Sequence, residues 1–133
     1  MKKYLKESKK NIIFFCPSIE EGGVEKNLIN ICNGIAVTHK ISVITANKNK
    51  KKHFNSKINF ISPNTNFFNY KIRLIKSIIC AYLLIKNHTK RNSVIISFQS
   101  NIIAIIVSKL LDYKIIIRAN QSPSNYARNF IKR

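Results

Sequence analysis

The chain has 133 residues, which is enough for one hydrophobic core but too short for two domains of ordinary size. A hydrophobic content of 45% and a charged content of 22% are typical of a globular protein and exclude a disordered chain. The net charge is +19, but Lys, Asn and Ile recur almost throughout, so an AT-rich coding bias is enough to explain the excess of lysine. No arginine-rich or aromatic-interleaved run resembles a nucleic-acid module. We therefore do not expect nucleic acid as a partner.

Residues 1–10 form a basic tail that lacks the features of a signal peptide. The longest apolar stretches, 78–85 and 102–107, fall short of the roughly 20 residues that a membrane-spanning helix needs. The cysteines Cys16, Cys32 and Cys80 lie in apolar runs without CxxC spacing, so we expect small core residues in a reducing compartment and no zinc site.

The first half of the chain alternates strand and helix patterns. Residues 11–16 are a continuous apolar run that ends before Pro17, which is typical of a strand covered on both faces. Apolar residues then recur every three or four positions through 24–35 and predict an amphipathic helix. Two further strands are predicted at 41–45 and 58–61, and the lysine cluster between them is expected to form a solvated loop.

The second half continues the alternation. A long helix is predicted over 69–88, a strand over 93–97, a helix over 101–111, a strand over 114–118 and the beginning of a helix over 126–133. The 101–111 helix is apolar nearly all round, so we expect it to be buried. The side of the 69–88 helix that we expect to pack carries Ile72, Ile75, Ile79, Tyr82 and Leu83.

This order of elements predicts an α/β, Rossmann-like domain, a parallel sheet with helices on both faces. Ligands of such sheets bind outside the carboxyl ends of the strands. Three segments are expected at that edge, namely 17–25, 97–101 and 118–123.

The first segment contains Gly22 and Gly23 at the head of the predicted helix. Glycines there let the backbone approach a phosphate or a sugar hydroxyl, and they equally well make a tight strand-to-helix turn. Glu20 and Glu21 would repel a bare phosphate, so a ligand rich in hydroxyl groups fits at least as well. Glu25 lies in the first helical turn, where it is favourable on the helix dipole or available to an acceptor hydroxyl.

The second segment offers neutral hydrogen-bonding groups, with Ser97 and Gln99 as candidate ligand residues. A competing interpretation makes Ser100 or Asn101 a simple N-cap of the following helix.

The third segment joins Arg118 to Asn120, a pair suited to an anion or a sugar, although a solvated arginine remains an alternative. None of the three histidines, His39, His53 and His88, is expected at the ligand edge, and Asp112 is expected at the opposite edge. No complete acid–base pair can therefore be assembled from these residues.

Three segments together resemble a known family. Residues 14–28, with the Gly-Gly-Val-Glu-Lys turn, then 94–98 and 115–123 are similar to the N-terminal domain of family 4 glycosyltransferases. The resemblance covers about 11–123, and its most specific element is the glycine turn.

The resemblance implies one half of a GT-B architecture over 11–133, a retaining sugar transfer from a nucleotide donor, and neither a metal nor another cofactor. By position it implies that Gly22 and Gly23 form the turn that approaches the donor phosphate or the acceptor, and that Arg118 and Asn120 border the interdomain cleft; we list all four as candidates for binding the donor. We assign Glu25, Ser97 and Gln99 to the acceptor side; no single catalytic residue is identified. The C-terminal donor domain with its paired glutamates is missing, so we expect a truncated enzyme that is inactive alone and needs that domain as a partner.

The expected function is surface polysaccharide or glycan synthesis in the cytoplasm, with a nucleotide-sugar and a glycan or lipid-linked acceptor. The resemblance also makes an anionic membrane surface a possible partner, through the basic and apolar region 71–86. A core helix with solvated ends explains that region equally simply. The competing functions are a non-catalytic Rossmann-like binding module and, less favoured, a basic nucleic-acid binder.

Overall fold

A computed structural model describes residues 11–64, 72–87 and 93–119. The predicted tail 1–10, the predicted helix 126–133 and Asn120 lie outside the described residues. The elements, in chain order, are β1 (Asn11–Phe15), α1 (Gly23–Ile35), β2 (Lys40–Ile44), the 3-10 helix η1 (Lys48–His53), β3 (Asn59–Ile61), α2 (Arg73–Lys86), β4 (Ser93–Ser97), α3 (Asn101–Leu110) and β5 (Lys114–Ile117).

The strands form one parallel sheet in the order β3-β2-β1-β4-β5, which confirms the predicted Rossmann-like α/β fold. In the central register, Phe15 lies opposite Ile44 of β2 and Ser97 of β4. The three central strands therefore end level, and the loops that follow them leave the sheet along one edge.

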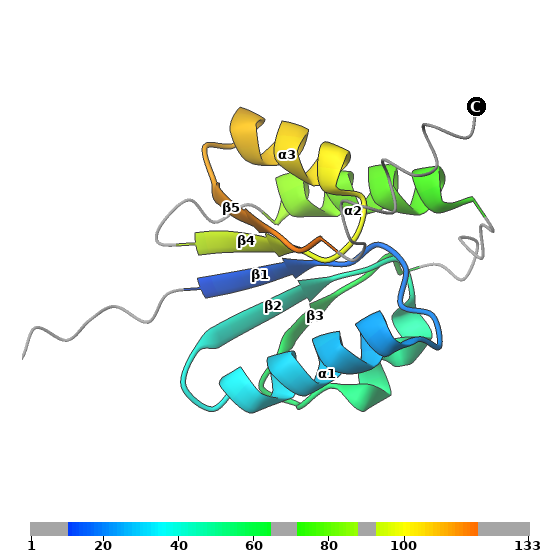
Figure 1. The fold of residues 1–133 in the computed structure, drawn as a ribbon, viewed down its shortest axis with the longest axis vertical. Coiled ribbons are helices and arrows are strands. Elements are labelled where there is room, and N and C mark those ends of the chain that lie inside the picture. Colours follow the sequence, from blue (N-terminus) through cyan, green and yellow to red (C-terminus); the bar gives the residue numbers. More distant parts are fainter. Residues whose placement is uncertain (1–10, 65–71, 88–92, 120–133) are drawn as a thin grey trace, which may run out of the picture.

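Helices cover both faces of the sheet (Figure 1). α1 lies on one face, while α2 and α3 lie side by side on the other. Phe14 packs in the core under α1, and its neighbours Ile13 and Phe15 pack in the core under α2 and α3. Successive residues of a strand point to opposite faces, so burial on both faces explains the unbroken apolar run of β1.

The three cysteines are free and buried, as predicted: Cys16 and Cys32 lie in the core under α1, and Cys80 lies in the core under α2. Burial raises the pKa of the Cys32 thiol to about 12 and that of the Cys80 thiol to about 12. The pKa of Cys16 is raised as well, first by burial and then by the charge of Glu25. All three thiols are thus held in the protonated, unreactive form.

The predicted orientation of α2 was wrong in part. Ser77, Cys80 and Leu84 are its buried residues, whereas Ile72 and Tyr82, expected on the packed side, are exposed. Apolar residues lie on more than one side of this helix, so the pattern alone does not decide which apolar side packs on the sheet. The sheet side is instead the one with small residues, which allow close packing.

The prediction that the helix at 101–111 is buried was also wrong. α3 buries Ala104, Val107 and Ser108 against the sheet, but Ile102 and Leu110 are exposed, because nothing in the described residues covers its outer side. None of the helices within residues 11–64, 72–87 and 93–119 combines the length and apolar character needed to cross a lipid bilayer.

The lysine cluster after β2 is solvent-exposed as predicted, but it forms the 3-10 helix η1 and not a loop. The side chain of Asn33 on α1 holds its end in place. Asn33 donates from Nδ2 to the carbonyl of His53 at 3.0 Å and accepts at Oδ1 from the amide of Asn55 at 2.8 Å. The end of η1 is therefore fixed against the last turns of α1.

Candidate functional site

The chain changes direction between β1 and β4, which are neighbours in the sheet. After β1 it continues through α1 to β2 on one side, and after β4 through α3 to β5 on the other. The two following loops diverge and leave a crevice at the switch point, where open α/β sheets bind ligands.

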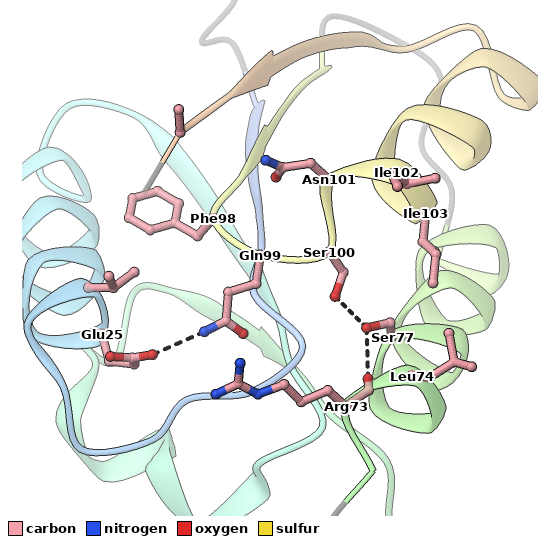
Figure 2. A pocket seen from close by; sticks show the side chains of 12 residues that line it. Glu25, Arg73, Leu74, Ser77, Phe98, Gln99, Ser100, Asn101, Ile102 and Ile103 are labelled. Atoms are coloured by element: carbon pink, nitrogen blue, oxygen red, sulfur yellow. Dashed lines mark hydrogen bonds between the residues drawn. The ribbon is translucent and has the colours of Figure 1, made fainter. Parts of the chain in front are cut away.

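A pocket of about 960 Å³ occupies this crevice (Figure 2). We call it the switch-point pocket. It is lined by Val24 and Glu25 of α1, by Arg73, Leu74 and Ser77 of α2, by residues 98–103 at the β4–α3 junction, and by Ala119.

Three helix N-termini converge on the switch-point pocket. Within the described residues, none of the three N-cap residues, Gly22, Ile72 and Ser100, forms a side-chain cap hydrogen bond. The first amide groups of an α-helix have no intrahelical partner, and the helix dipole places positive potential at this end. The pocket is therefore surrounded by hydrogen-bond donors suited to phosphate or hydroxyl oxygens.

Glu25 and Gln99 point toward one another at one wall of the pocket in Figure 2. Gln99 donates from Nε2 to Oε1 of Glu25 at 3.0 Å, and its own Oε1 accepts from the amide of Ser18 at 3.2 Å. Glu25 is only 8% exposed. The nitrogen and the oxygen of the Gln99 side-chain amide are thus both engaged, and the nitrogen orients a nearly buried carboxylate at the pocket wall.

The two glycines of the turn have different surroundings. A Cβ atom on Gly22 would lie 2.5 Å from Oε2 of Glu25, so a side chain at this position would displace the Glu25 carboxylate from its place against Gln99. A Cβ atom on Gly23 would meet nothing within 4 Å. An internal contact therefore explains Gly22, whereas Gly23 lies in front of open space.

A charged cluster lies beside the pocket. The hydroxyl of Ser18 donates to Oε1 of Glu20 at 2.8 Å and accepts from Nζ of Lys76 at 3.0 Å, and Arg73 pairs with Oε2 of Glu20 at 3.5 Å. The Ser18 hydroxyl, and then the charges of Arg73 and Lys76, lower the pKa of Glu20. Arg73, although paired, is largely exposed and lines the pocket, so its remaining donors can meet an anionic ligand.

The N-cap interpretation holds for the position of Ser100, but Ser100 forms no side-chain cap hydrogen bond. Ser100 occupies the N-cap position of α3 with a left-handed backbone, φ 55°, but its hydroxyl pairs with that of Ser77. Asn101 accepts from the hydroxyl of Ser97 at 2.8 Å and donates to the carbonyl of Arg118 at 3.4 Å. Ser97 is buried and does not line the pocket, so its hydroxyl connects the ends of β4 and β5.

Arg118 lies next to the pocket without lining it. Its guanidinium stacks 4.8 Å from the ring centroid of Phe98, which does line the pocket. Nη1 is buried and has no hydrogen-bond partner among the described residues. The expectation that Arg118 is simply solvated is therefore not met, and its predicted companion Asn120 lies outside the described residues.

A second hollow, of about 600 Å³, lies on the other side of the glycine turn. We call it the glycine-loop pocket. Gly22 and Gly23 line it together with Glu25, Lys50 and His53. The prediction that no histidine lies at the ligand edge was wrong for His53, because η1 folds back against α1.

The contribution of α2 to the site was not predicted from the sequence. Arg73 and Ser77 line the switch-point pocket, and Lys76 reaches Ser18. The signal was present, since any helix that follows a parallel strand returns with its N-terminus at the carboxyl edge of the sheet.

In the part of the chain that the structure describes, no three His, Cys, Asp or Glu side chains are grouped closely enough to hold a metal ion. No protein-family model and no curated protein sequence matches the chain.

Proposed function

We propose that the chain is the acceptor-side domain of a retaining, nucleotide-sugar-dependent glycosyltransferase of the GT-B type. The observation that carries the proposal is the convergence of three helix N-termini and an oriented carboxylate on one pocket at the topological switch point. Nucleotide-sugars and glycans combine phosphate and hydroxyl groups, which are the groups this pocket is equipped to bind. The resemblance of the glycine turn to family 4 supports the same assignment.

The two ends of the pocket suit different parts of the reactants. Arg73 and the N-terminus of α2 favour phosphate oxygens. Glu25 repels a phosphate but accepts hydrogen bonds from sugar hydroxyl groups, and Gln99 keeps its carboxylate in place. We therefore assign the phosphates to the α2 end and an acceptor hydroxyl to the Glu25 end.

Gly23 belongs to the donor side in this proposal. Gly23 lines the glycine-loop pocket and not the switch-point pocket, so it would contact the part of the donor that extends past the α2 end and around the glycine turn. There, a backbone without a side chain at the first position of α1 faces open space and would let that part approach the helix amides. Arg118 acts on the same side through Phe98, since its guanidinium stacks on that ring and its buried Nη1 has no hydrogen-bond partner within the described part of the chain.

The nucleotide and the paired glutamates are supplied, in this proposal, by a second Rossmann-like domain that faces the pocket. The chain then works in the cytoplasm, in surface polysaccharide or glycan synthesis, on a glycan or lipid-linked acceptor. Transfer requires both domains, whereas phosphate and acceptor contacts are made by this one.

The test is calorimetric titration of the chain with UDP-sugars and GDP-sugars, followed by a sugar-transfer assay on an extracted lipid fraction. Both are run with the chain alone and together with the protein encoded downstream. Gly23→Ala should weaken binding at least ten-fold through a steric block. Gly34→Ala is the matched control, because Gly34 lies within α1 and a Cβ atom there would also meet nothing within 4 Å.

A non-catalytic Rossmann-like binding module is the second candidate. The nearby carboxylates already have partners within the domain, since Glu25 is bound to Gln99, and Glu20 to Ser18 and Arg73. A binding module needs no free catalytic carboxylate, so these contacts favour this second candidate. Binding of a nucleotide-sugar without transfer in any combination would select this module. Equal binding by the Gly23→Ala and Gly34→Ala variants would refute the donor assignment.

A further inference from the structure

Another hollow, of about 540 Å³, lies on the α2 side of the sheet. Three lysines line it: Lys40 at the start of β2, Lys57 two residues before β3, and Lys86 at the end of α2. α2 runs against the direction of the strands, so its end lies toward their amino ends (Figure 1). We call this space the three-lysine hollow. It shares no lining residue with the switch-point pocket or the glycine-loop pocket.

The sheet places two of the lysines next to each other. Ser42 of β2 lies opposite Asn59 of β3, and both line the hollow. Lys40 and Lys57 precede these two residues by two positions each, and side chains two positions apart share one face of a strand. Like charges at neighbouring positions on one face are destabilising. The third lysine, from α2, adds to this repulsion.

No carboxylate of the described residues balances these charges. The lining of the three-lysine hollow contains neither Asp nor Glu. Both ion pairs within residues 11–64, 72–87 and 93–119 use other cations, Lys50 and Arg73. Buried Ile13 and Leu84 belong to the lining as well, so part of the hollow is apolar, and charges attract more strongly beside an apolar wall than in open water. An anion in the hollow would therefore replace the repulsion among three lysines by attraction.

Neutral hydrogen-bond donors complete the lining. Three asparagines line the hollow, and the Nδ2 atom of each donates one hydrogen bond within the protein: Asn11, Asn59 and Asn87. The NH2 group of an asparagine has two N–H donors, so each of these side chains keeps one for a ligand. Ser42, only 7% exposed, accepts from Asn59 at 3.5 Å and can still donate its own hydroxyl hydrogen. Cations and neutral donors thus surround one space from β1, β2, β3 and α2.

We infer that the three-lysine hollow binds an oligophosphate group, a chain of two or three linked phosphates that is either free in solution or part of a nucleotide. Lysine ammonium groups bind phosphate as point charges, and the amide N–H groups donate to the remaining oxygens. Each phosphate brings negative charge of its own, so linked phosphates match three lysines better than a single phosphate does. The site does not depend on the proposed sugar transfer, because its residues lie apart from the switch-point pocket.

The test is calorimetric titration of the chain with sodium tripolyphosphate and, separately, with orthophosphate, at about 150 mM salt to screen distant charges. We expect tripolyphosphate to bind at least about ten-fold more tightly, because it can contact several lysines at once. Lys40→Gln, Lys57→Gln and Lys86→Gln should each weaken its binding about ten-fold. The largest amide NMR shifts on binding should belong to Ser42 and Asn59. ATP is the second probe: binding tighter than that of tripolyphosphate supports a nucleotide as the source of the phosphates, and weaker binding supports a free oligophosphate.

The control must separate this site from the general attraction of a chain with a net charge of +19 for anions. The triple variant that changes all three lysines of the hollow to glutamine should show no measurable binding. Lys51→Gln, Lys52→Gln and Lys109→Gln, combined, remove the same charge at exposed positions outside the hollow and should leave binding within about two-fold. Circular dichroism melts verify that both triple variants are folded.

Four results would overturn the inference. They are absence of tripolyphosphate binding, equal affinity for orthophosphate, equal losses in the two triple variants, and amide shifts that are largest in η1. The last two would show that tripolyphosphate responds to the net charge or to the exposed lysines of η1 and not to the three-lysine hollow.

Discussion

Gln99 and Glu25, 74 positions apart in the chain, are joined by a hydrogen bond of 3.0 Å from Nε2 to Oε1. Gln99 also accepts from the amide of Ser18. One side chain at the end of β4 thereby connects the loop after β1 with the first turn of α1. The glycine turn is held in place by this connection.

Gln99→Leu should lower the free energy of unfolding by about 1–3 kcal/mol, because it leaves the buried carboxylate of Glu25 and the amide of Ser18 without their partner. Urea denaturation measures the change. Asn30→Leu, on the exposed side of α1, is the control and should stay within about 0.5 kcal/mol of the unmodified chain. Equal effects of the two substitutions would contradict the role of Gln99.

Alanine at the two glycines should change stability in opposite directions. Gly22→Ala forces Glu25 away from Gln99, whereas Gly23→Ala meets open space and should stabilise the ligand-free chain by about 0.4–1 kcal/mol. Thermal melts give both values. Adding Glu25→Ala should remove most of the Gly22→Ala penalty, and a penalty that persists in this double variant would mean that the carboxylate is not its cause.

The regular elements could be predicted from the sequence because their burial is simple. β1, buried on both faces, appears as an unbroken apolar run, and the amphipathic pattern of α1 reflects its single packed side. The parallel sheet followed from the alternation of these patterns.

The predictions failed where the pattern of apolar residues does not coincide with the residues that are buried. α3 is apolar all round but has a sheet on one side only, so Ile102 and Leu110 are exposed. The candidate residues Glu25 and Gln99 were identified individually, yet their mutual hydrogen bond depends on the sheet order that brings β4 next to β1. His53 was missed because the turn of η1 against α1 depends on the distant Asn33.

The buried thiols should make the fold sensitive to alkali. Folding raises the pKa of Cys32 and of Cys80 to about 12 from an ordinary value of 9.0. Their stabilising contribution is complete below about pH 9 and is lost as pH rises from there toward about 12, by about 1.4 kcal/mol per pH unit for each thiol. Urea denaturation of the chain and of Cys80→Ala at about pH 8 and about pH 10 tests this. The alanine variant should lose about 1.4 kcal/mol less, and an identical pH dependence would argue against burial of Cys80.

Ser18→Ala should raise the pKa of Glu20 toward its ordinary value, because the Ser18 hydroxyl is the main cause of the lowered pKa. The ionised Glu20 stabilises the fold above that ordinary value, and this small contribution is lost as pH falls through the lowered pKa. Carboxyl NMR titration follows the change directly. Ser56→Ala, at an exposed position, should leave the Glu20 titration unaltered. A similar pKa shift of Glu20 in the Ser56→Ala variant would mean that loss of the Ser18 hydroxyl is not the specific cause.

Glu25 lines both the switch-point pocket and the glycine-loop pocket. Its Oε1 accepts from Gln99 in the switch-point pocket, while its Oε2 lies beside Gly22 in the glycine-loop pocket, so one rigid carboxylate presents an oxygen to each. A ligand that attracts it into one pocket withdraws it from the other, so occupancy of the two is thermodynamically linked. The linkage is reciprocal: whatever factor the first ligand imposes on the affinity for the second, the second imposes on the first.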